Sequence, residues 1–422
     1  PIKLTGTKNN VAFTEAPLGI QLGAAGEYRY TAELRNGNAE KIDGDVTYSL
    51  AYDDGNAATY TGVSINAETG KLTVTDNAMP QTIYVKAASG GYTRLARTVL
   101  YSLKFSFGTT AQNGYTQVTS AAAYSDSKGF GIEGAAVDEA SAITGSGVIF
   151  KVKLQKGRVY SVKAKYQGTI RCERVNSDFP GFDRTKASLA EDTYNVAIFG
   201  DDVMDITLPS GGRLAYVEIT PVEKTAAAKP DWWTIGDSTV QQNGSWGYTI
   251  AASSTTDLSK YPELAAKVNG FHNSGQAGRQ HKNYYTEGFL NNVLTGINPG
   301  DVVSISGMGT NDSSSSRAQF KAYDEMYVNA ILDMGGYVIL GSYTPTGNYG
   351  ETQGRVYDAD TMTFKGMRTK AYDLAIRGLY EEYKDNGHVL GFVDIGRIAD
   401  EKMTADVKAL GAEIKRLEDQ AA

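Results

Sequence analysis

The feature that most constrains the fold of this chain is a change of pattern at about residue 230. From there on, short apolar runs without polar alternation are each followed by a stretch in which apolar residues have helical spacing. Strands that are apolar on both sides are buried on both faces, which is typical of a parallel sheet whose strands are joined by helices. The pattern predicts strands at 232–235, 268–273, 302–306, 337–340 and 389–394, and helices at about 245–252, 284–294, 317–334 and 364–384.

The first half of the chain has a different pattern, with short alternating strands separated by turn residues. Residues 1–100 predict strands at 28–34, 46–51, 71–74 and 83–87, and a hairpin at 63–74. Residues 101–224 predict strands at 148–154, 160–164, 204–208 and 214–220, in two antiparallel sheets packed face to face. Residues 225–230 are small and polar and predict a linker. We therefore expect a multi-domain chain: two all-β sandwich domains, 1–100 and 101–224, followed by an α/β domain with a parallel sheet, 231–422.

Composition excludes several function classes. A chain of 422 residues is too long for one compact core, and 41% hydrophobic with 21% charged residues is typical of folded protein. The net charge of −7 and the lack of a basic run argue against a nucleic-acid partner. Cys172 is the only cysteine, so an intrachain disulfide and a cysteine-based zinc site are excluded. No apolar stretch is long enough to span a bilayer, and no signal peptide precedes Pro1, which we interpret as a processed N-terminus.

Unusual residues follow the first three strands of the predicted parallel sheet. Gly236-Asp237-Ser238 comes after the first, the glycine-rich stretch 273–279 after the second, and 307–312 after the third. Chemistry in such sheets lies at the carboxyl ends of the strands. A nucleophilic serine needs hydrogen-bond donors about 3 Å from the developing oxyanion, and a glycine N–H and an asparagine amide are suitable donors. If the first strand lies between the second and third, all three segments meet at Ser238.

These three blocks resemble those of the SGNH hydrolases, and most of all the rhamnogalacturonan acetylesterase-like carbohydrate esterases. The matching strings are Gly236-Asp-Ser-Thr-Val240, Asn273-x-x-x-Ala-Gly-Arg279 and Gly309-Thr-Asn-Asp312. The resemblance implies a flavodoxin-like three-layer fold for residues 231–422. It also implies Ser238 as the nucleophile, with the Gly278 backbone N–H and the Asn311 side chain as oxyanion donors. It implies neither a metal nor another cofactor.

The two N-terminal segments carry resemblances of their own. Residues 1–100 resemble bacterial Ig-like domains, which are usually spacers. Residues 101–224 resemble the galactose-binding-like jelly roll that precedes the esterase domain in related proteins. Tyr115 and Tyr124 are candidate stacking faces for a sugar, and the alternative is that these rings belong to the core.

The fourth block of the family, Asp-x-x-His after the fifth strand, is missing. The chain has three histidines. His272 lies within a predicted strand, and His388 precedes the fifth strand, at the wrong end of the sheet. His281 follows the glycine loop and remains the one candidate base. Residues 395–422 instead predict an amphipathic helix. Either the chain ends before its catalytic histidine, which we favour, or the protein never had one.

The sequence thus predicts a secreted or cell-surface bacterial serine esterase that deacetylates a plant-type polysaccharide of the pectin or rhamnogalacturonan kind. Its partner would be the acetylated poly- or oligosaccharide, and its activity would be impaired without the base. The alternative is a non-catalytic carbohydrate-binding or surface protein with a degenerate SGNH domain. A phosphate-binding function is disfavoured, because no Gly-Lys-Ser/Thr string accompanies the glycine loops.

Overall fold

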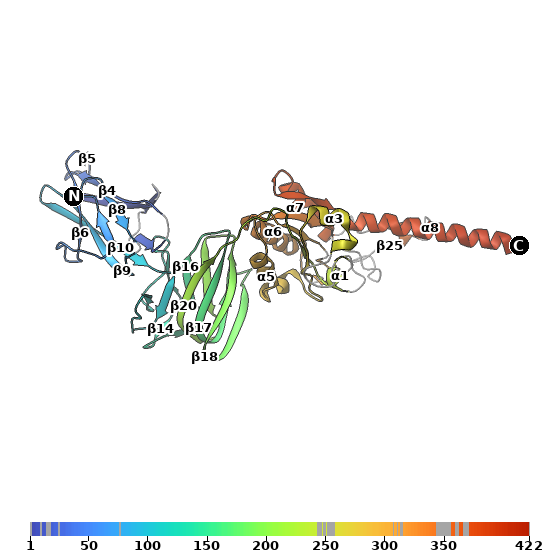
Figure 1. The fold of residues 1–422 in the computed structure, drawn as a ribbon, viewed down its shortest axis with the longest axis horizontal. Helices are drawn as coiled ribbons and strands as arrows, with labels where there is room; N and C mark the ends of the chain where they lie inside the picture. Colours follow the sequence, from blue (N-terminus) through green and yellow to red (C-terminus); the bar gives the residue numbers. More distant parts are fainter. Residues whose placement is uncertain are drawn as a thin grey trace.

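The chain is elongated, with three parts in succession along its long axis. Figure 1 shows the N-terminus at one end and the C-terminus at the tip of a long projecting helix at the other. This computed structural model describes residues 2–8, 11–13, 18–23, 26–75, 77–242, 247, 250, 258–306, 308–309, 311–312, 315–342, 356–358, 363–365 and 371–421.

The N-terminal part consists of two sheets. The strands are β1 (Ile2–Lys8), β2 (Val11–Phe13), β3 (Leu18–Gln21), β4 (Tyr28–Arg35), β5 (Lys41–Ile42), β6 (Thr47–Ala51), β7 (Val63–Ile65), β8 (Lys71–Val74), β9 (Gln81–Ser89) and β10 (Tyr92–Tyr101). One sheet has the order β2-β1-β4-β8-β7, with β5 beside β4, and the other has the order β3-β10-β9-β6. Buried side chains of both sheets, such as Tyr30 and Val85, belong to one hydrophobic cluster. The predicted hairpin is confirmed, because β7 and β8 pair antiparallel with Ser64 opposite Thr73.

The second part differs from the expected pair of separate sheets, because its strands form one hydrogen-bonded network of ten. They are β11 (Lys104–Phe107), β12 (Thr116–Val118), β13 (Phe130–Glu133), β14 (Val137–Asp138), β15 (Ile143–Gly145), β16 (Val148–Lys153), β17 (Arg158–Cys172), β18 (Phe182–Ile198), β19 (Val203–Leu208) and β20 (Gly212–Val222). The cause is β17, which is longer than predicted and pairs with β18, β20 and, at its end, β19. Its register against β18 shifts between Tyr166 and Gly168, an irregularity of the kind that bends a strand.

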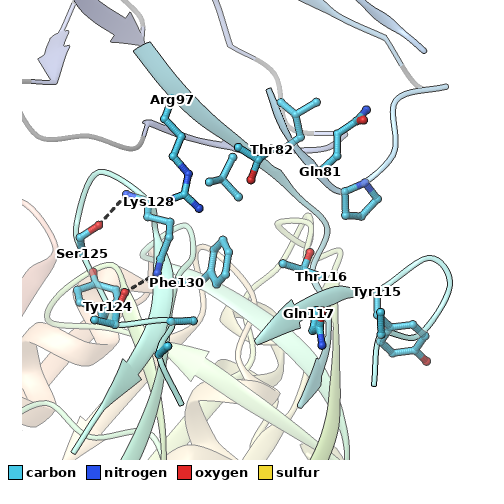
Figure 2. Close-up of a pocket in the computed structure, with 17 residues that line it drawn as sticks. Gln81, Thr82, Arg97, Tyr115, Thr116, Gln117, Tyr124, Ser125, Lys128 and Phe130 are labelled. Atoms are coloured by element: carbon cyan, nitrogen blue, oxygen red, sulfur yellow. Dashed lines mark hydrogen bonds between the residues drawn. The ribbon is translucent and has the colours of Figure 1, made fainter. Parts of the chain in front are cut away.

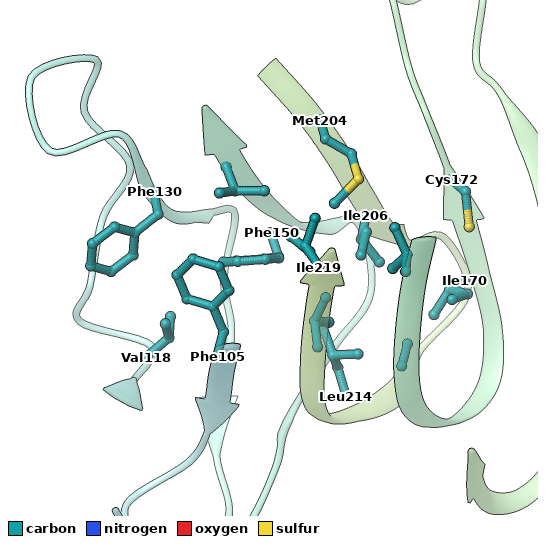
Figure 3. Close-up of a cluster of buried hydrophobic side chains, with 14 of the residues drawn as sticks. Phe105, Val118, Phe130, Phe150, Ile170, Cys172, Met204, Ile206, Leu214 and Ile219 are labelled. Atoms are coloured by element: carbon teal, nitrogen blue, oxygen red, sulfur yellow. The ribbon is translucent and has the colours of Figure 1, made fainter. Parts of the chain in front are cut away.

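The core of this second part is built around aromatic rings (Figure 3). The ring centroid of Phe105 lies 5.4 Å from that of Phe130 and 4.9 Å from that of Phe150. Cys172 lies in the same cluster, and burial raises the pKa of its thiol to about 12. The thiol is therefore a packing group and not a nucleophile.

The third part contains the predicted parallel sheet. Its strands are β21 (Trp232–Ile235), β22 (Phe271–Asn273), β23 (Val302–Ile305), β24 (Tyr337–Gly341) and β27 (Val389–Val393). The order is β22-β21-β23-β24-β27, and all neighbours are parallel. The first strand therefore lies between the second and third, as the arrangement of the three sequence blocks requires. A separate pair, β25 (Val356–Asp358) and β26 (Thr363–Lys365), is antiparallel.

The helices of this part are α1 (Ser238–Gln241), the 3-10 helix η1 (Leu258–Lys260), α3 (Pro262–Lys267), α4 (His281–Thr286), α5 (Phe289–Gly296), α6 (Arg317–Asp333), α7 (Ala371–Tyr383) and α8 (Ile395–Ala421). The helix predicted at 284–294 is two helices, because Gly288 between them has a φ of +84°, which a continuing helix does not allow. The helix predicted at 364–384 begins only at residue 371, after β26. Most of the helix predicted at 245–252 lies outside the described residues.

The helices α4, α5, α6 and α7 contribute with the sheet to one large hydrophobic cluster, to which Ile235, Val303 and Leu340 belong. On the other side, residues of η1 and α3 pack with Phe271 and Trp232. The side chains of Ile339 and Val393 there line an apolar pocket of about 310 Å³ next to the start of α8. In the described part of the chain, the second helical layer expected of a three-layer fold is thus only partly present.

The second and third parts share a core across the sequence boundary at 225–230. Val159, Ala197 and Phe199 belong to the same cluster as the helices of the third part. The Asn291 side chain on α5 accepts a hydrogen bond from Ala197 N at 3.2 Å and donates one to Asn195 O at 2.9 Å. The second part thus keeps its own aromatic core but also contributes buried residues to the core of the third part.

Candidate active site

Ser238 lies at the point where β21 ends and α1 begins. The Asp237 carboxylate caps this helix, since its Oδ1 accepts hydrogen bonds from Thr239 N and Thr239 Oγ1, both at 2.8 Å. Gly236 makes the turn sterically feasible, because a Cβ at this position would lie 2.3 Å from Val240 Cγ2 and 2.5 Å from Ser306 O. The Ser238 side chain is half-buried, and among the described residues none hydrogen-bonds its hydroxyl.

The glycine-rich loop after β22 is hydrogen-bonded to this turn. Ser274 N donates to Thr234 O at 3.0 Å, and Gln276 N donates to Gly236 O at 2.8 Å. Ala277 N donates to the Gln241 side chain at 2.7 Å. The next residue, Gly278, is exposed with a φ of +74°, and its N–H has no acceptor in the described part of the chain. An N–H with no acceptor, held by a loop that is fixed on both sides, is a suitable donor for an anion.

Asn311 follows β23 and reaches both of the other segments. Its Nδ2 donates to Asp237 Oδ2 at 3.2 Å and to Arg279 O at 3.3 Å. These two bonds lie at the upper end of the N–H···O range and use both Nδ2 hydrogens, so an oxyanion would take the place of one of these acceptors. Burial raises the pKa of Asp237, with the nearby Asp312 charge acting in the same direction. The structure therefore brings Ser238, the Gly278 loop and Asn311 to one edge of the sheet.

His281 occupies a different environment from the one a general base needs. Its ring is fully buried, with Nδ1 at 3.2 Å from Asp312 Oδ2 and Nε2 at 2.8 Å from Asp324 Oδ1. Its backbone N–H also donates to Asp312 Oδ1 at 3.2 Å, and Tyr327 donates its hydroxyl to His281 O at 2.6 Å. The ring is bound at both nitrogens, and neither nitrogen faces Ser238.

The charges around His281 keep the imidazole protonated. Burial alone would lower its pKa, but the Asp324 charge and the hydrogen bonds to both carboxylates outweigh burial and raise the pKa to about 10. An imidazole that is protonated at neutral pH cannot accept the Ser238 proton there. The geometry thus contradicts the candidate role of His281 as base, because its ring is bound to Asp312, the neighbour of Asn311, and to Asp324.

The other two histidines are also bound to neighbouring groups. His272 Nε2 lies 3.0 Å from Asp231 Oδ2, and the ring stacks on Trp233 with centroids 3.9 Å apart. His388 Nδ1 lies 3.2 Å from Gly336 O, and its ring stacks on Tyr337. All three histidines of the sequence are described, and none of them contacts Ser238.

Sequence reasoning missed the buried cluster of Asp312, His281 and Asp324. One signal could have indicated it, because Asp324 falls on the apolar face of α6 in register with Phe320, Tyr327 and Ile331, all of which are buried. Outside the masked segments, no group of three or more His, Cys, Asp or Glu side chains is arranged to hold a metal ion. No described helix is both long and apolar enough to cross a membrane.

No protein-family model matches the chain, and no curated protein matches it. Among solved structures it is similar to the protein YXIM of Bacillus subtilis, with 19% identity over 72% of this chain and 88% of that one and a TM-score of 0.34. A family two carbohydrate esterase from Clostridium thermocellum, solved with cellohexaose, has 13% identity over 64% and 95%, with a TM-score of 0.24. A peptidoglycan O-acetylesterase has 10% identity over 70% and 80%, with a TM-score of 0.22. At these TM-scores the similarities carry no functional argument.

Proposed function

We infer that the chain is an SGNH-type serine esterase that removes acetyl groups from a polysaccharide of the pectin or rhamnogalacturonan kind, exported to the cell surface or secreted. The observation that carries this inference is the Asn311 side chain, which is hydrogen-bonded both to Asp237, next to Ser238, and to Arg279, next to Gly278. One amide thus connects all three blocks at the carboxyl edge of the sheet.

In the proposed reaction, Ser238 Oγ attacks the ester carbonyl carbon. The tetrahedral oxyanion is stabilised by the backbone N–H groups of Ser238 and Gly278 and by Asn311 Nδ2. The carbon–oxygen bond to the sugar then breaks, the sugar hydroxyl leaves with a proton, and an acetyl group stays on Ser238. Water hydrolyses this acyl-enzyme to acetate and regenerates the serine.

None of the three histidines of the chain is placed to act as the base for this sequence of steps. Since each of its histidines is bound elsewhere, proton removal from Ser238 falls to water, and the reaction is slow by several orders of magnitude relative to a complete triad. This same observation favours the second candidate function, a carbohydrate-binding protein on a degenerate esterase fold. The two candidates differ in one respect, which is whether Ser238 reacts with an ester.

Chemical rescue separates the two functions. Acetate release from acetylated pectin is measured for the wild type and for Ser238→Ala, each with and without added imidazole as an external base. The esterase proposal predicts slow release that imidazole accelerates only in the wild type. Equal rates for the two chains at every imidazole concentration would instead support the non-catalytic binding function.

A further inference from the structure

A second cavity lies far from Ser238 in the sequence, between the N-terminal part and the ten-stranded part. It has a volume of about 630 Å³ and is lined by residues of β9, β10, β12 and the loop that precedes β13. Figure 2 shows Gln81, Thr82 and Arg97 on one side of the cavity and Tyr124 and Lys128 on the other. This volume falls in the range of sites that bind small molecules.

The cavity is positively charged although the chain as a whole has a net charge of −7. Among the described residues that line it are Arg97 and Lys128 but no aspartate or glutamate. In the described part of the molecule, neither of these two cations is ion-paired with a carboxylate. Burial, and then the neighbouring Arg97 charge, lowers the pKa of Lys128, so the two like charges repel each other. An anion bound between them would relieve this repulsion.

Lys128 is held in place for such a contact. Its Nζ donates to Ala123 O and lies 5.1 Å from the centroid of the Phe130 ring. An ammonium group has three donors, so donors remain for a ligand after the bond to Ala123. Arg97 is exposed on β10, and its guanidinium extends toward Lys128 across the cavity (Figure 2).

Aromatic and amide side chains line other parts of the cavity. Tyr115 and Tyr124, the two rings singled out from the sequence, both line this cavity and are half-buried, so they do not belong to the core. Gln81 and Gln117 add amide groups, and Gln117 Nε2 is fixed by bonds to Gly108 O at 3.0 Å and Thr109 O at 2.9 Å. Apolar ring surfaces beside fixed polar groups are suited to a sugar, which has both apolar faces and hydroxyls.

We propose that this cavity binds a uronate, a sugar unit with a carboxylate, within an acidic polysaccharide chain. The carboxylate would lie between Arg97 and Lys128, because a guanidinium forms paired hydrogen bonds with a carboxylate. The rings and amides would contact the rest of the sugar. This binding function goes beyond the esterase proposal and is independent of it, because no residue of the cavity belongs to the Ser238 site.

Binding of a short oligogalacturonate to the full chain, measured by isothermal titration calorimetry, tests the proposal. The wild type is expected to bind, and its affinity is expected to fall as NaCl is added. Arg97→Gln and Lys128→Gln should each weaken binding about tenfold or more, the usual effect of removing a charged hydrogen-bond partner. Arg94→Gln, which removes an exposed cation from the same strand but outside the cavity, is the matched control and should bind like the wild type. Ser238→Ala should also bind like the wild type, so failure of the esterase proposal would not affect this result.

Several outcomes would overturn the proposal. The first is that the wild type does not bind the oligogalacturonate. The second is that a neutral galacto-oligosaccharide of the same length binds with the same affinity. The third is that Arg97→Gln and Lys128→Gln both bind as tightly as the wild type. Displacement of the oligosaccharide by an equal concentration of sulfate would reduce the cavity to a simple anion site. Circular dichroism melting of each variant shows whether it is folded, and Arg97 is exposed, so Arg97→Gln keeps the test decisive if Lys128→Gln unfolds.

Discussion

The Asn311 side chain donates a hydrogen bond to the Asp237 carboxylate across 3.2 Å, and this bond joins the loop after β23 to the turn that carries Ser238. A carboxylate next to the nucleophile thus orients the amide that is proposed to contact the oxyanion. The bond also explains why Asp237 is buried without a cation, since its acceptors are filled by Thr239 and Asn311.

Replacing Asn311 by alanine should slow Ser238 acylation by an activated acetyl ester about 10²–10³-fold, the usual effect of losing one oxyanion donor. The apparent affinity for the ester should change little, because the donor acts mainly in the transition state. Asn283→Ala removes an exposed asparagine from the nearby helix α4 and is the control. Equal acylation rates for the two variants would rule out the oxyanion role of Asn311.

His281 predicts a pH dependence of stability. The folded-state pKa is raised from 6.5 to about 10, so the stabilisation by the protonated ring is fully present below pH 6.5 and is lost as the pH rises through about 10. Wild-type melting temperature should therefore fall between these pH values, and His281→Gln should melt lower with a flatter profile.

Removing one partner of a buried ion pair costs about 3–5 kcal/mol, so His281→Gln could fail to fold. In that case the ring of the wild type provides the test, because its two nitrogen chemical shifts at pH 8 should be those of a doubly protonated imidazole. A neutral ring at pH 8 would contradict the described arrangement.

Glu173 also predicts a pH dependence of stability, but here the buried group is a carboxyl and not a histidine ring. Neither carboxylate oxygen has a hydrogen bond in the described part of the chain, and burial raises its pKa well above 4.5, with Asp201 and Asp205 adding to the effect. Stability from the protonated form is present below pH 4.5 and is lost as the pH rises through the folded-state pKa. Glu173→Gln should thus melt higher than the wild type at pH 9, by roughly 2–4 °C for each gain of about 1 kcal/mol in the free energy of unfolding. At pH 4.5 the two chains should melt at the same temperature. Glu223→Gln, at an exposed side chain, should have no effect at either pH.

The core shared by the second and third parts predicts that Asn291 is important for stability. Alanine at this position leaves Ala197 N and Asn195 O without their bonds, at a cost of roughly 1–3 kcal/mol for each buried group that stays unpaired. Urea denaturation should show this loss for Asn291→Ala but not for Asn292→Ala, its exposed neighbour on α5. Equal midpoints for the two variants would mean that the shared core contributes little.

Local pattern predicted the five parallel strands of the third part better than its helices, because apolar runs such as Val302–Ile305 are typical of strands buried on both faces of a parallel sheet. The resemblance to a known family and the strand order together indicated that Ser238, Gly278 and Asn311 meet. Long-range contacts were not predictable in this way. The single sheet of the second part depends on β17 pairing with three other strands. The alternation of apolar and polar residues in β17 does not show which strands it pairs with.

The roles of charged residues were hardest to predict. His281 looked like a candidate base because it follows a glycine loop, and only the fold shows that Asp312 and Asp324 bind both of its nitrogens. Arg97 and Lys128 come from different parts of the chain, and each alone is an ordinary surface cation in the sequence. The proposed anion site depends on the cavity that these two cations share, in which no described lining residue is an acid.

The reactivity of Ser238 is the central claim, and mass spectrometry of the covalent intermediate tests it most directly. The chain is incubated with p-nitrophenyl acetate, quenched in acid and digested. Because no histidine is placed to assist deacylation either, the account predicts an acetyl group that accumulates on the peptide containing Ser238. This acetyl group should be reduced in Asn311→Ala and absent from that peptide in Ser238→Ala. An unmodified Ser238 after long incubation, with acetyl groups only on surface lysines, would contradict the account.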